Sequence, residues 1–345
     1  MKIIAAFDSF KGCLSSPEAA AAVRRAAEDT LPGAEVVEVA VADGGEGTLE
    51  ALVGSLGGRY MTATVSDPLG RPTVARYGIA GSLGIIEASR ACGITLLKEE
   101  ERNPLLTTTR GVGELILDAI ANGCERFLVG IGGSATNDGG RGMIEAEGFL
   151  EKARRCNFTV ACDVDTPFIG PFGASRVFAP QKGASPAEVE ILDRRLTDYA
   201  KVILSETGVD VRDMPGAGAA GGLGGAFAAY LGAELRPGVE MVLEAIGFGT
   251  LLEGADLVLT GEGCSDVQTA RGKAPAGVLA HARKKGVPVA LVSGAVKHCP
   301  ELDAMGFAAI IPATPESMPL EEAMKPEMAK ENIYRAVRSL LKAYA

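Results

Sequence analysis

The chain begins with MKIIAAFDSFKGCLSSPEAAAAVRRAAEDT (residues 1–30), and this stretch indicates the fold class. Residues 1–7 form an apolar run that stops at Asp8, as expected for a parallel strand that is buried on both faces. A helix is then predicted, because a serine precedes Pro17 and alanine-rich sequence follows it. Residues 36–41 form a second buried strand before another helix, so the sequence predicts an α/β fold with a parallel sheet.

The pattern changes along the chain and then returns. Residues 60–89 alternate apolar and polar positions between turns, which is typical of antiparallel strands. After residue 244 short apolar strands and helices alternate again. The sequence therefore predicts two nested α/β domains: a Rossmann-like parallel-sheet domain of residues 1–65 and 245–345, and an inserted mixed-sheet α/β domain of residues 66–244.

Composition narrows the class of protein. The chain has 34 Lys and Arg against 44 Asp and Glu, a formal net charge of −10, and no basic block, which argues against nucleic-acid binding. Its seven cysteines are scattered, which predicts free thiols in a reducing cytoplasm rather than disulfides or a zinc site. No apolar run approaches the roughly 18 residues that span a membrane. We therefore expect a cytoplasmic protein without membrane or nucleic-acid partners, and the sequence specifies no oligomeric state.

Glycine is the unusual component, with 45 of 345 residues clustered beside apolar runs. The cluster GIGGSATNDGG (residues 130–140) lies between an expected strand and an expected helix. Main-chain amides and a helix N-terminus can bind an anion in such a loop, although a tight turn is the alternative. The candidate phosphate- or substrate-binding residues are Gly132, Gly133, Ser134, Ala135, Thr136 and Asn137, and Asp138 is a candidate catalytic base or Mg²⁺ ligand.

Further polar residues follow the expected strands at their carboxyl ends, where α/β folds bind ligands, although solvated loop residues are the alternative. They are Asp8, Ser9 and Lys11 after the first strand, Asp43, Gly44, Gly45 and Glu46 after the second, and Glu262, Asp266 and Gln268 after residues 257–260. The catalytic candidates among them are Asp8, Lys11, Asp43 and Asp266. Asp163 is a candidate metal ligand, and Lys182, after an expected short strand at residues 175–180, is a candidate phosphate ligand, with turn residues as the alternative for both.

Several mechanisms are disfavoured. PGAGAAGGLGG (residues 215–225) contains G-x-G-x-x-G, but no strand directly precedes it, so close backbone packing or another ligand is favoured over NAD. Neither His281 nor His298 suits a Ser-His-Asp mechanism, and the sequence has no GxSxG, HExxH or GxxxxGK[ST]. Loop amides, a few cations and carboxylates that hold a metal are what phosphoryl transfer requires.

The motifs DSFKGCLSSPEA (residues 8–19), VADGGEGT (residues 41–48), GIGGSATNDGG and PGAGAAGGLGGA resemble, in this order, the type I glycerate kinase family. Together with shorter motifs, the resemblance extends from residue 8 to about residue 278. It implies an ATP- and Mg²⁺-dependent kinase that converts D-glycerate to phosphoglycerate, 2-phosphoglycerate being preferred over 3-phosphoglycerate, in a cleft between the domains. Asp43 and Asp138 are the preferred catalytic carboxylates, since each lies in a glycine-rich loop at a strand end.

The sequence departs from the family pattern at a few positions. Cys264 stands where the family has arginine, so Lys11 or Lys273 would have to compensate at a phosphate. The chain is also shorter than the family pattern between Gly148 and Phe158. Two alternatives to the kinase remain: an NAD(P)-dependent hydroxy-acid dehydrogenase, and a metabolite-binding homologue that Cys264 has weakened as a catalyst.

Overall fold

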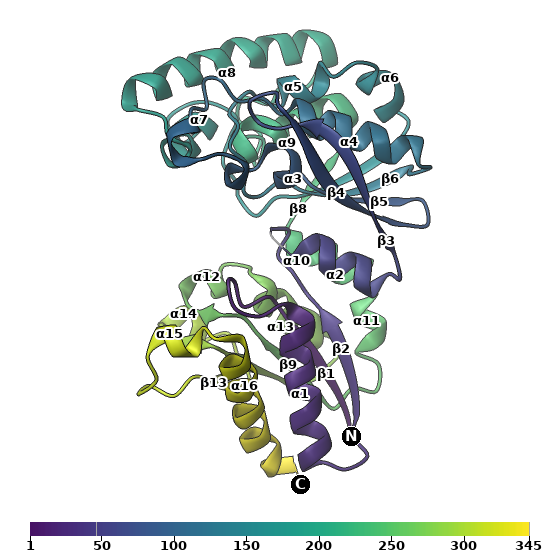
Figure 1. The fold of residues 1–345 in the computed structure, drawn as a ribbon, viewed down its shortest axis with the longest axis vertical. Helices are drawn as coiled ribbons and strands as arrows, with labels where there is room; N and C mark the ends of the chain where they lie inside the picture. Colours follow the sequence, from purple (N-terminus) through teal and green to yellow (C-terminus); the bar gives the residue numbers. More distant parts are fainter. Residues whose placement is uncertain (46, 345) are drawn as a thin grey trace. The chain divides into compact units, whose positions relative to one another are not determined.

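The computed structural model describes residues 1–45 and 47–344, which form two compact units (Figure 1). Unit 1 consists of Met1–Asp43, Glu50–Ser55 and Val242–Ala345, and unit 2 consists of Gly44–Leu49 and Leu56–Met241. Helices α2 (Thr48–Ser55) and α10 (Gly238–Ala245) extend across the limits of the units. The strand at Arg59–Ser66, which extends across the predicted domain boundary at residue 65, lies within unit 2.

The described part of unit 1 contains a five-stranded parallel sheet in the order β13-β11-β9-β1-β2. Strand β1 is paired on one side with the edge strand β2, where Ile3 lies opposite Val36, and on the other with β9, where Ile3 lies opposite Leu257. The N-terminal and C-terminal parts of the chain therefore build one sheet, as the sequence predicted. The strands are β1 (Lys2–Phe7), β2 (Glu35–Ala40), β9 (Leu257–Gly261), β11 (Val289–Ser293) and β13 (Ala309–Pro312), with a small pair β10 (Cys264–Ser265) and β12 (Ala295–Val296).

Helices of unit 1 bury apolar faces against this sheet. Helix α1 (Ser16–Thr30) starts at a capping box, in which the Ser15 amide donates to the Glu18 carboxylate at 3.0 Å. Its buried alanines share one apolar core with α16 (Pro326–Leu341), and the two helices lie side by side (Figure 1). The other helices are α11 (Phe248–Leu251), α12 (Val267–Ala270), α13 (Ala274–Lys284), α14 (Pro300–Asp303), α15 (Leu320–Ala323) and the 3₁₀ turn Lys342–Tyr344.

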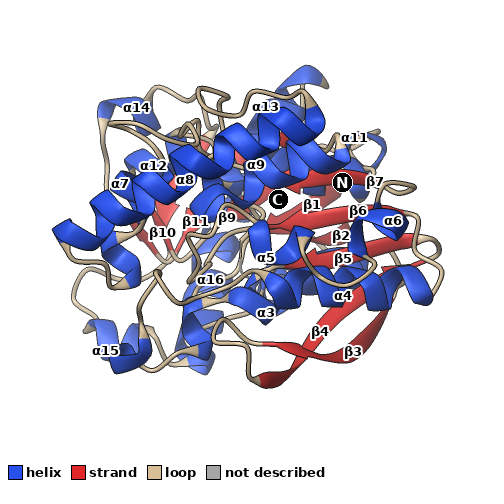
Figure 2. Ribbon diagram, turned by 90° about the horizontal axis from the view of Figure 1, so that it is seen from above, coloured by secondary structure: helices blue, strands red, loops and turns tan. Residues whose placement is uncertain are grey.

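The described part of unit 2 contains a six-stranded mixed sheet in the order β3-β4-β5-β6-β7-β8. Strands β3 and β4 form an antiparallel hairpin in which Arg59 lies opposite Ile79 (Figure 2), and β4 is antiparallel to β5. The remaining neighbours are parallel, so the predicted mixed sheet is confirmed. The strands are β3 (Arg59–Ser66), β4 (Pro72–Ala80), β5 (Leu83–Glu87), β6 (Arg126–Gly130), β7 (Asn157–Ala161) and β8 (Glu234–Arg236).

Two elements of unit 2 differ from the sequence prediction. Residues 175–180, expected as a strand, are mostly helix, and the helix after the 130–140 loop is only one turn, so its dipole adds little to that loop. The α helices are α3 (Ser89–Cys92), α4 (Arg110–Ala121), α5 (Arg141–Ile144), α6 (Phe149–Ala153), α7 (Ala174–Phe178), α8 (Pro186–Thr207) and α9 (Ala219–Leu231). The 3₁₀ turns are Ile94–Leu96, Glu99–Glu101 and Pro180–Lys182.

The structure therefore confirms the predicted fold class, with a parallel sheet built from both ends of the chain and a mixed-sheet α/β unit inserted between them. Within the residues that the structure describes, none of the helices has the length and apolar character needed to cross a bilayer.

Candidate active site

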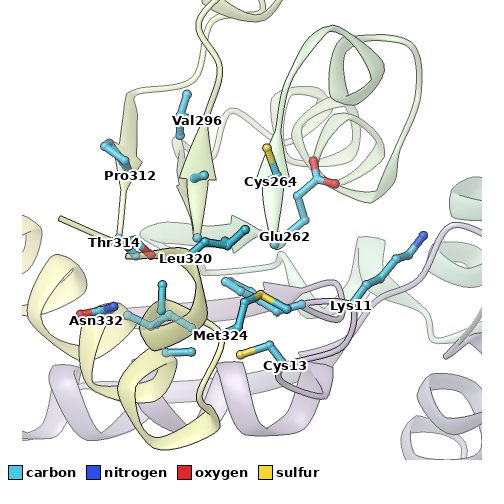
Figure 3. Close-up of a pocket in the computed structure, with 18 of the residues that line it drawn as sticks. Lys11, Cys13, Glu262, Cys264, Val296, Pro312, Thr314, Leu320, Met324 and Asn332 are labelled. Carbon is cyan, nitrogen blue, oxygen red and sulfur yellow. The ribbon is translucent and has the colours of Figure 1, made fainter. Parts of the chain in front are cut away.

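A cavity of about 770 Å³ lies in unit 1 at the carboxyl ends of strands β1, β9, β11 and β13; we call it the strand-end cavity (Figure 3). The residues that directly follow these four strands all contribute to its wall, because parallel strands end at the same edge of a sheet. Among the candidate catalytic and binding residues from the sequence, those that line it are Asp8, Ser9, Lys11, Asp43 and Glu262.

Asp8 is a buried carboxyl group of the cavity whose pKa is raised. It follows β1, is 4% exposed, and accepts a hydrogen bond from the Ser9 amide at 2.7 Å. Burial raises the pKa of Asp8, and the negative charge of Asp43 raises it further, to about 7. A carboxyl group with this pKa gains and loses a proton near neutral pH, as a general base must.

Glu262 follows β9 and is fixed by its surroundings. One carboxylate oxygen accepts hydrogen bonds from the hydroxyls of Thr269 at 2.6 Å and Ser265 at 3.1 Å. The other oxygen lies 3.5 Å from the Lys273 ammonium. Since Ser265 also shares a 2.7 Å hydrogen bond with Ser293, the network ties together the ends of β9 and β11. Glu262 therefore presents a negative charge in one defined place.

Cations face these carboxylates within the same cavity. Lys11, Lys273 and Lys297 belong to its lining, and the Lys11 side chain is exposed. Cys264, which replaces the arginine of the family pattern, lines it too, and burial raises the pKa of its thiol. The cavity thus offers lysine ammonium groups for an anion, with a neutral thiol in the position of the expected arginine.

Two residues predicted for this site have other surroundings. The Asp266 carboxylate accepts the Gln268 amide at 2.8 Å and thereby caps α12. Gln268 is exposed, and neither residue belongs to the lining of the cavity. Both side chains lie in the expected loop but outside the cavity wall.

An apolar wall completes the strand-end cavity. Val296, Pro312, Leu320 and Met324 line it from β12, β13, α15 and the residue after α15 (Figure 3). Sequence reasoning missed this wall and also Asn332 of α16, which lines the cavity. These residues form no motif, and each is an ordinary helix or strand residue in sequence, so no local signal marked them.

The glycine-rich loop of residues 130–140 lies in unit 2, after β6. Gly132 and Gly133 are exposed, whereas Ser134, Ala135, Thr136 and Asn137 are buried. The Ala135 amide donates to the Cys92 carbonyl at 2.8 Å, and the Asn137 amide group donates to Ser175 at 2.8 Å. The accessible part of this loop is therefore the pair of exposed glycines.

Lys182 holds this loop in place through two hydrogen bonds. It is 3% exposed, and its ammonium donates to the Ser134 hydroxyl at 2.9 Å and to the Thr136 carbonyl at 2.7 Å. Burial lowers the pKa of Lys182 to about 8. The sequence singled out Lys182 as a candidate phosphate ligand, and its contacts make it a residue that positions the 130–140 loop.

Asp138 is engaged by the protein itself. Its carboxylate accepts the Thr109 amide at 2.8 Å, the Thr109 hydroxyl at 2.9 Å, the Gly142 amide at 3.1 Å and the Gly140 amide at 3.1 Å. These bonds cap the starts of α4 and α5. Burial nevertheless raises the pKa of Asp138.

The second glycine-rich stretch packs against the first. Ala220, Gly221 and Gly222 adopt left-handed backbone angles, with φ of 53°, 70° and 94°. A Cβ atom on Gly221 would lie 2.1 Å from the Thr136 carbonyl oxygen, and the Gly139 amide donates to the Gly221 carbonyl at 3.0 Å. This geometry supports close backbone packing, which the sequence favoured over a dinucleotide fingerprint.

The loop after β2 contributes the remaining candidates. Gly44 packs on the end of β7, since a Cβ atom there would lie 2.4 Å from that of Ala161, and Gly45 follows it. Glu46 lies outside the described residues. The Asp163 carboxylate accepts the Gly238 amide at 2.9 Å, at the start of α10.

Comparisons with known proteins agree with the motifs. The sequence profile of the glycerate kinase family matches the chain in two segments, residues 3–152 and 144–345. The two segments meet close to the place where the chain is shorter than the family pattern. A glycerate kinase of Bacillus subtilis (strain 168) is 42% identical over 373 residues, which cover 99% of this chain and 97% of that protein. A glycerate 2-kinase of Escherichia coli (strain K12) is 41% identical over 371 residues, with coverage of 99% and 97%.

A solved structure has the same fold. The crystal structure assigned as glycerate kinase 2 from Salmonella typhimurium LT2 is similar with a TM-score of 0.89 and 40% sequence identity, and the match covers 100% of this chain and 98% of that one. The resemblance that the sequence motifs indicated is thus confirmed over the full length. The chain belongs to the glycerate kinase family.

Proposed function

We propose that the chain transfers the γ-phosphoryl group of ATP to D-glycerate and forms 2-phosphoglycerate. Its family makes it a phosphotransferase of the glycerate kinase type, and the name of the Escherichia coli relative supports the 2-position over the 3-position. The observation that carries the proposal is the strand-end cavity, where a carboxyl group with a pKa of about 7 lies beside other carboxylates and lysines.

Asp8 is the base in this proposal. Its carboxylate accepts the proton of the substrate hydroxyl as the oxygen attacks the γ-phosphorus, and the β–γ bridging oxygen leaves with ADP. Because the pKa of Asp8 is raised by burial and by Asp43, the ionised form is basic enough for this transfer and is populated at neutral pH. Lys11 and Lys273 neutralise phosphate charge, which a flexible ammonium does without fixed geometry.

The carboxylates of the cavity also fit Mg²⁺. Asp43, Asp8 and Glu262 present oxygen ligands to one cavity, and oxygen is the ligand that Mg²⁺ prefers. Among residues 1–45 and 47–344 no three His, Cys, Asp or Glu side chains form a metal site by themselves. That finding suits an ion that is held by one or two carboxylates together with substrate phosphates and water. When bound, Mg²⁺ would supply charge neutralisation of the phosphates, with Asp43 as its carboxylate.

Residues of unit 2 have supporting roles in the proposal. The exposed amides of Gly132 and Gly133 bind the glycerate carboxylate, and Lys182 positions their loop. Asp138 acts as a structural cap, since its carboxylate already accepts four hydrogen bonds. An active site between the domains and a cytoplasmic location remain predictions from the sequence.

The test is a coupled assay of ADP release with D-glycerate and ATP, followed by phosphorus NMR of the product. We expect ADP release that depends on glycerate and Mg²⁺, and a phosphorus signal coupled to one methine proton, as for a phosphate on the 2-hydroxyl. Asp43→Asn should lower kcat at least about 100-fold, as expected for a group that supports the transferring phosphoryl. Asp198→Asn, at an exposed position of α8, is the matched control and should leave kcat unchanged.

Other results would support the alternatives. Glycerate binding without ADP release would favour a metabolite-binding homologue in which Cys264 weakens catalysis. Tight NADH binding together with glycerate-dependent reduction of NAD⁺ to NADH would favour the dehydrogenase, although the packing of Gly221 against Thr136 already argues against a dinucleotide at that stretch. A signal coupled to two methylene protons would replace the product by 3-phosphoglycerate.

A further inference from the structure

The strand-end cavity is much larger than glycerate needs. Glycerate is a three-carbon acid whose surface is almost entirely polar. A cavity of about 770 Å³ instead lies within the range of about 300–1,000 Å³ that is typical of cofactor- or drug-sized ligands. Its apolar wall of Val296, Pro312, Leu320 and Met324 would be left in contact with water if glycerate were the occupant. The cavity therefore fits a ligand that has one charged end and one flat apolar end.

The two ends of the cavity differ in chemistry. Lys11 lies on one side of the close-up and Asn332 on the other (Figure 3). A nucleoside triphosphate has this polarity, with phosphates that need cations and a base that needs apolar surface and a few polar contacts. The phosphates would thus lie at the lysine end and the base at the Asn332 end.

Asn332 has an unusual hydrogen-bond state. It lies on α16, is 2% exposed, and donates from its side-chain nitrogen to the Met318 sulfur at 3.3 Å. Its side-chain oxygen is buried and accepts no hydrogen bond within the described part of the chain. Buried polar atoms are rarely left without a partner, so an acceptor of this kind at a cavity wall calls for a donor from a ligand.

We propose that the strand-end cavity binds the nucleotide and that the Asn332 side-chain oxygen accepts the 6-amino group of adenine, so that Asn332 selects ATP over 6-keto nucleotides. This inference rests on the proposed kinase function and adds which substrate occupies the cavity and what reads its base. Asparagine pairs with adenine through the same amino group in nucleic-acid recognition. The 6-keto oxygen of inosine or guanine would place an acceptor against the asparagine oxygen, and the hydrogen bond from the asparagine nitrogen to the Met318 sulfur holds the amide in this orientation.

Inosine triphosphate tests the inference without altering the protein. It differs from ATP at the 6-position, where an oxygen replaces the amino group, and at N1, which then carries a proton. We expect the wild-type KM for inosine triphosphate to exceed that for ATP by about tenfold or more, while the KM for glycerate is the same with either donor. Calorimetric titration with ADP and with inosine diphosphate should show the same preference in binding alone.

Asn332→Leu tests the residue. Leucine is close to asparagine in size and removes a buried polar group, so the fold should be kept. We expect the KM for ATP to rise about tenfold, the KM for glycerate to stay unchanged, and the difference between ATP and inosine triphosphate to disappear. Arg335→Gln, at an exposed position of the same helix outside the cavity, should keep all three values.

The outcomes separate the inference from the proposed function. Equal KM values for ATP and inosine triphosphate in a wild-type protein that makes phosphoglycerate would overturn the inference and leave the kinase standing. A preference that survives in Asn332→Leu would also overturn the role of this residue. ADP binding with the expected base preference but without phosphoglycerate formation would instead refute the proposed function.

Discussion

The substitution Asp8→Asn separates the energetic cost of a buried carboxylate from its use in catalysis. Asp8 is 4% exposed, and burial together with the charge of Asp43 raises its pKa from 3.8 to about 7. In an unfolded chain the group returns to a pKa near 3.9. The folded state therefore prefers the protonated carboxyl group, so the stability of the wild-type protein falls as the pH rises from about 4 to about 7. Asparagine cannot ionise, so the variant does not lose stability in this way.

The size of this effect follows from the pKa shift. Each pKa unit corresponds to about 1.4 kcal/mol, so the full cost is at most ~4 kcal/mol above pH 7. The stability contribution of the protonated group is complete below about pH 4 and is lost as the pH rises through about 7. We expect Asp8→Asn to raise the free energy of unfolding by ~2–3 kcal/mol more at pH 8 than at pH 5.

Urea unfolding followed by circular dichroism at pH 5 and pH 8 measures the effect, and the ADP-release assay measures catalysis. Asp8→Asn should abolish most turnover while it stabilises the protein, and the wild-type kcat/KM should fall as the pH drops through about 7. The exposed Glu147→Gln serves as control and should change neither quantity. Equal effects of Asp8→Asn at both pH values would refute the raised pKa, and retained turnover would refute the role as base.

Three further substitutions test other parts of the structure. Gly221→Ala should lower the free energy of unfolding by ~3 kcal/mol or more in urea titrations, because the new Cβ would lie 2.1 Å from the Thr136 carbonyl oxygen. The control Gly232→Ala, at φ 61° in open space, should lower it by about 1–2 kcal/mol. Equal losses in the two variants would contradict the packing argument. Lys182→Met should speed hydrogen exchange in residues 130–140 and raise the KM for glycerate about tenfold, because it removes both hydrogen bonds that hold the loop. Unchanged hydrogen exchange would count against this positioning role. Cys264→Arg should lower the KM for ATP several-fold through an added phosphate contact, and an unchanged KM would mean that the lysines of the cavity already compensate.

The sheet strands were predictable because their signals are local. A short apolar run that ends in a glycine or an acid indicates a buried parallel strand, as at residues 1–7 and 257–260. The strand predicted at residues 175–180 was wrong, because a segment of this length fits a strand or a helical turn equally well. In the structure these residues belong mostly to α7 and a 3₁₀ turn. Packing with α8 and α9, which is not visible in the sequence, accompanies the helical form.

The candidate site was predictable only in part. Strand-end position was enough to single out Asp8, Asp43 and Glu262, because parallel strands bring their carboxyl ends to one edge. It did not distinguish them from Asp138, whose partners Thr109 and the Gly140 and Gly142 amides become visible only in three dimensions. Asn332 was missed because a single asparagine on an amphipathic helix has no signature in sequence.

The position of β1 between β2 and β9 in its sheet imposes an order on folding. Lys2–Phe7 is hydrogen-bonded to β2, which is made soon afterwards, and to β9 at Leu257–Gly261, which leaves the ribosome only after the whole of unit 2. Unit 2 is nearly continuous in sequence and can fold as soon as it is synthesised, whereas the sheet that carries Asp8 has to wait for its last three strands. During synthesis the first strands therefore spend the longest time with an unprotected edge, and slow translation after β2 would increase the exposure of the nascent chain to aggregation.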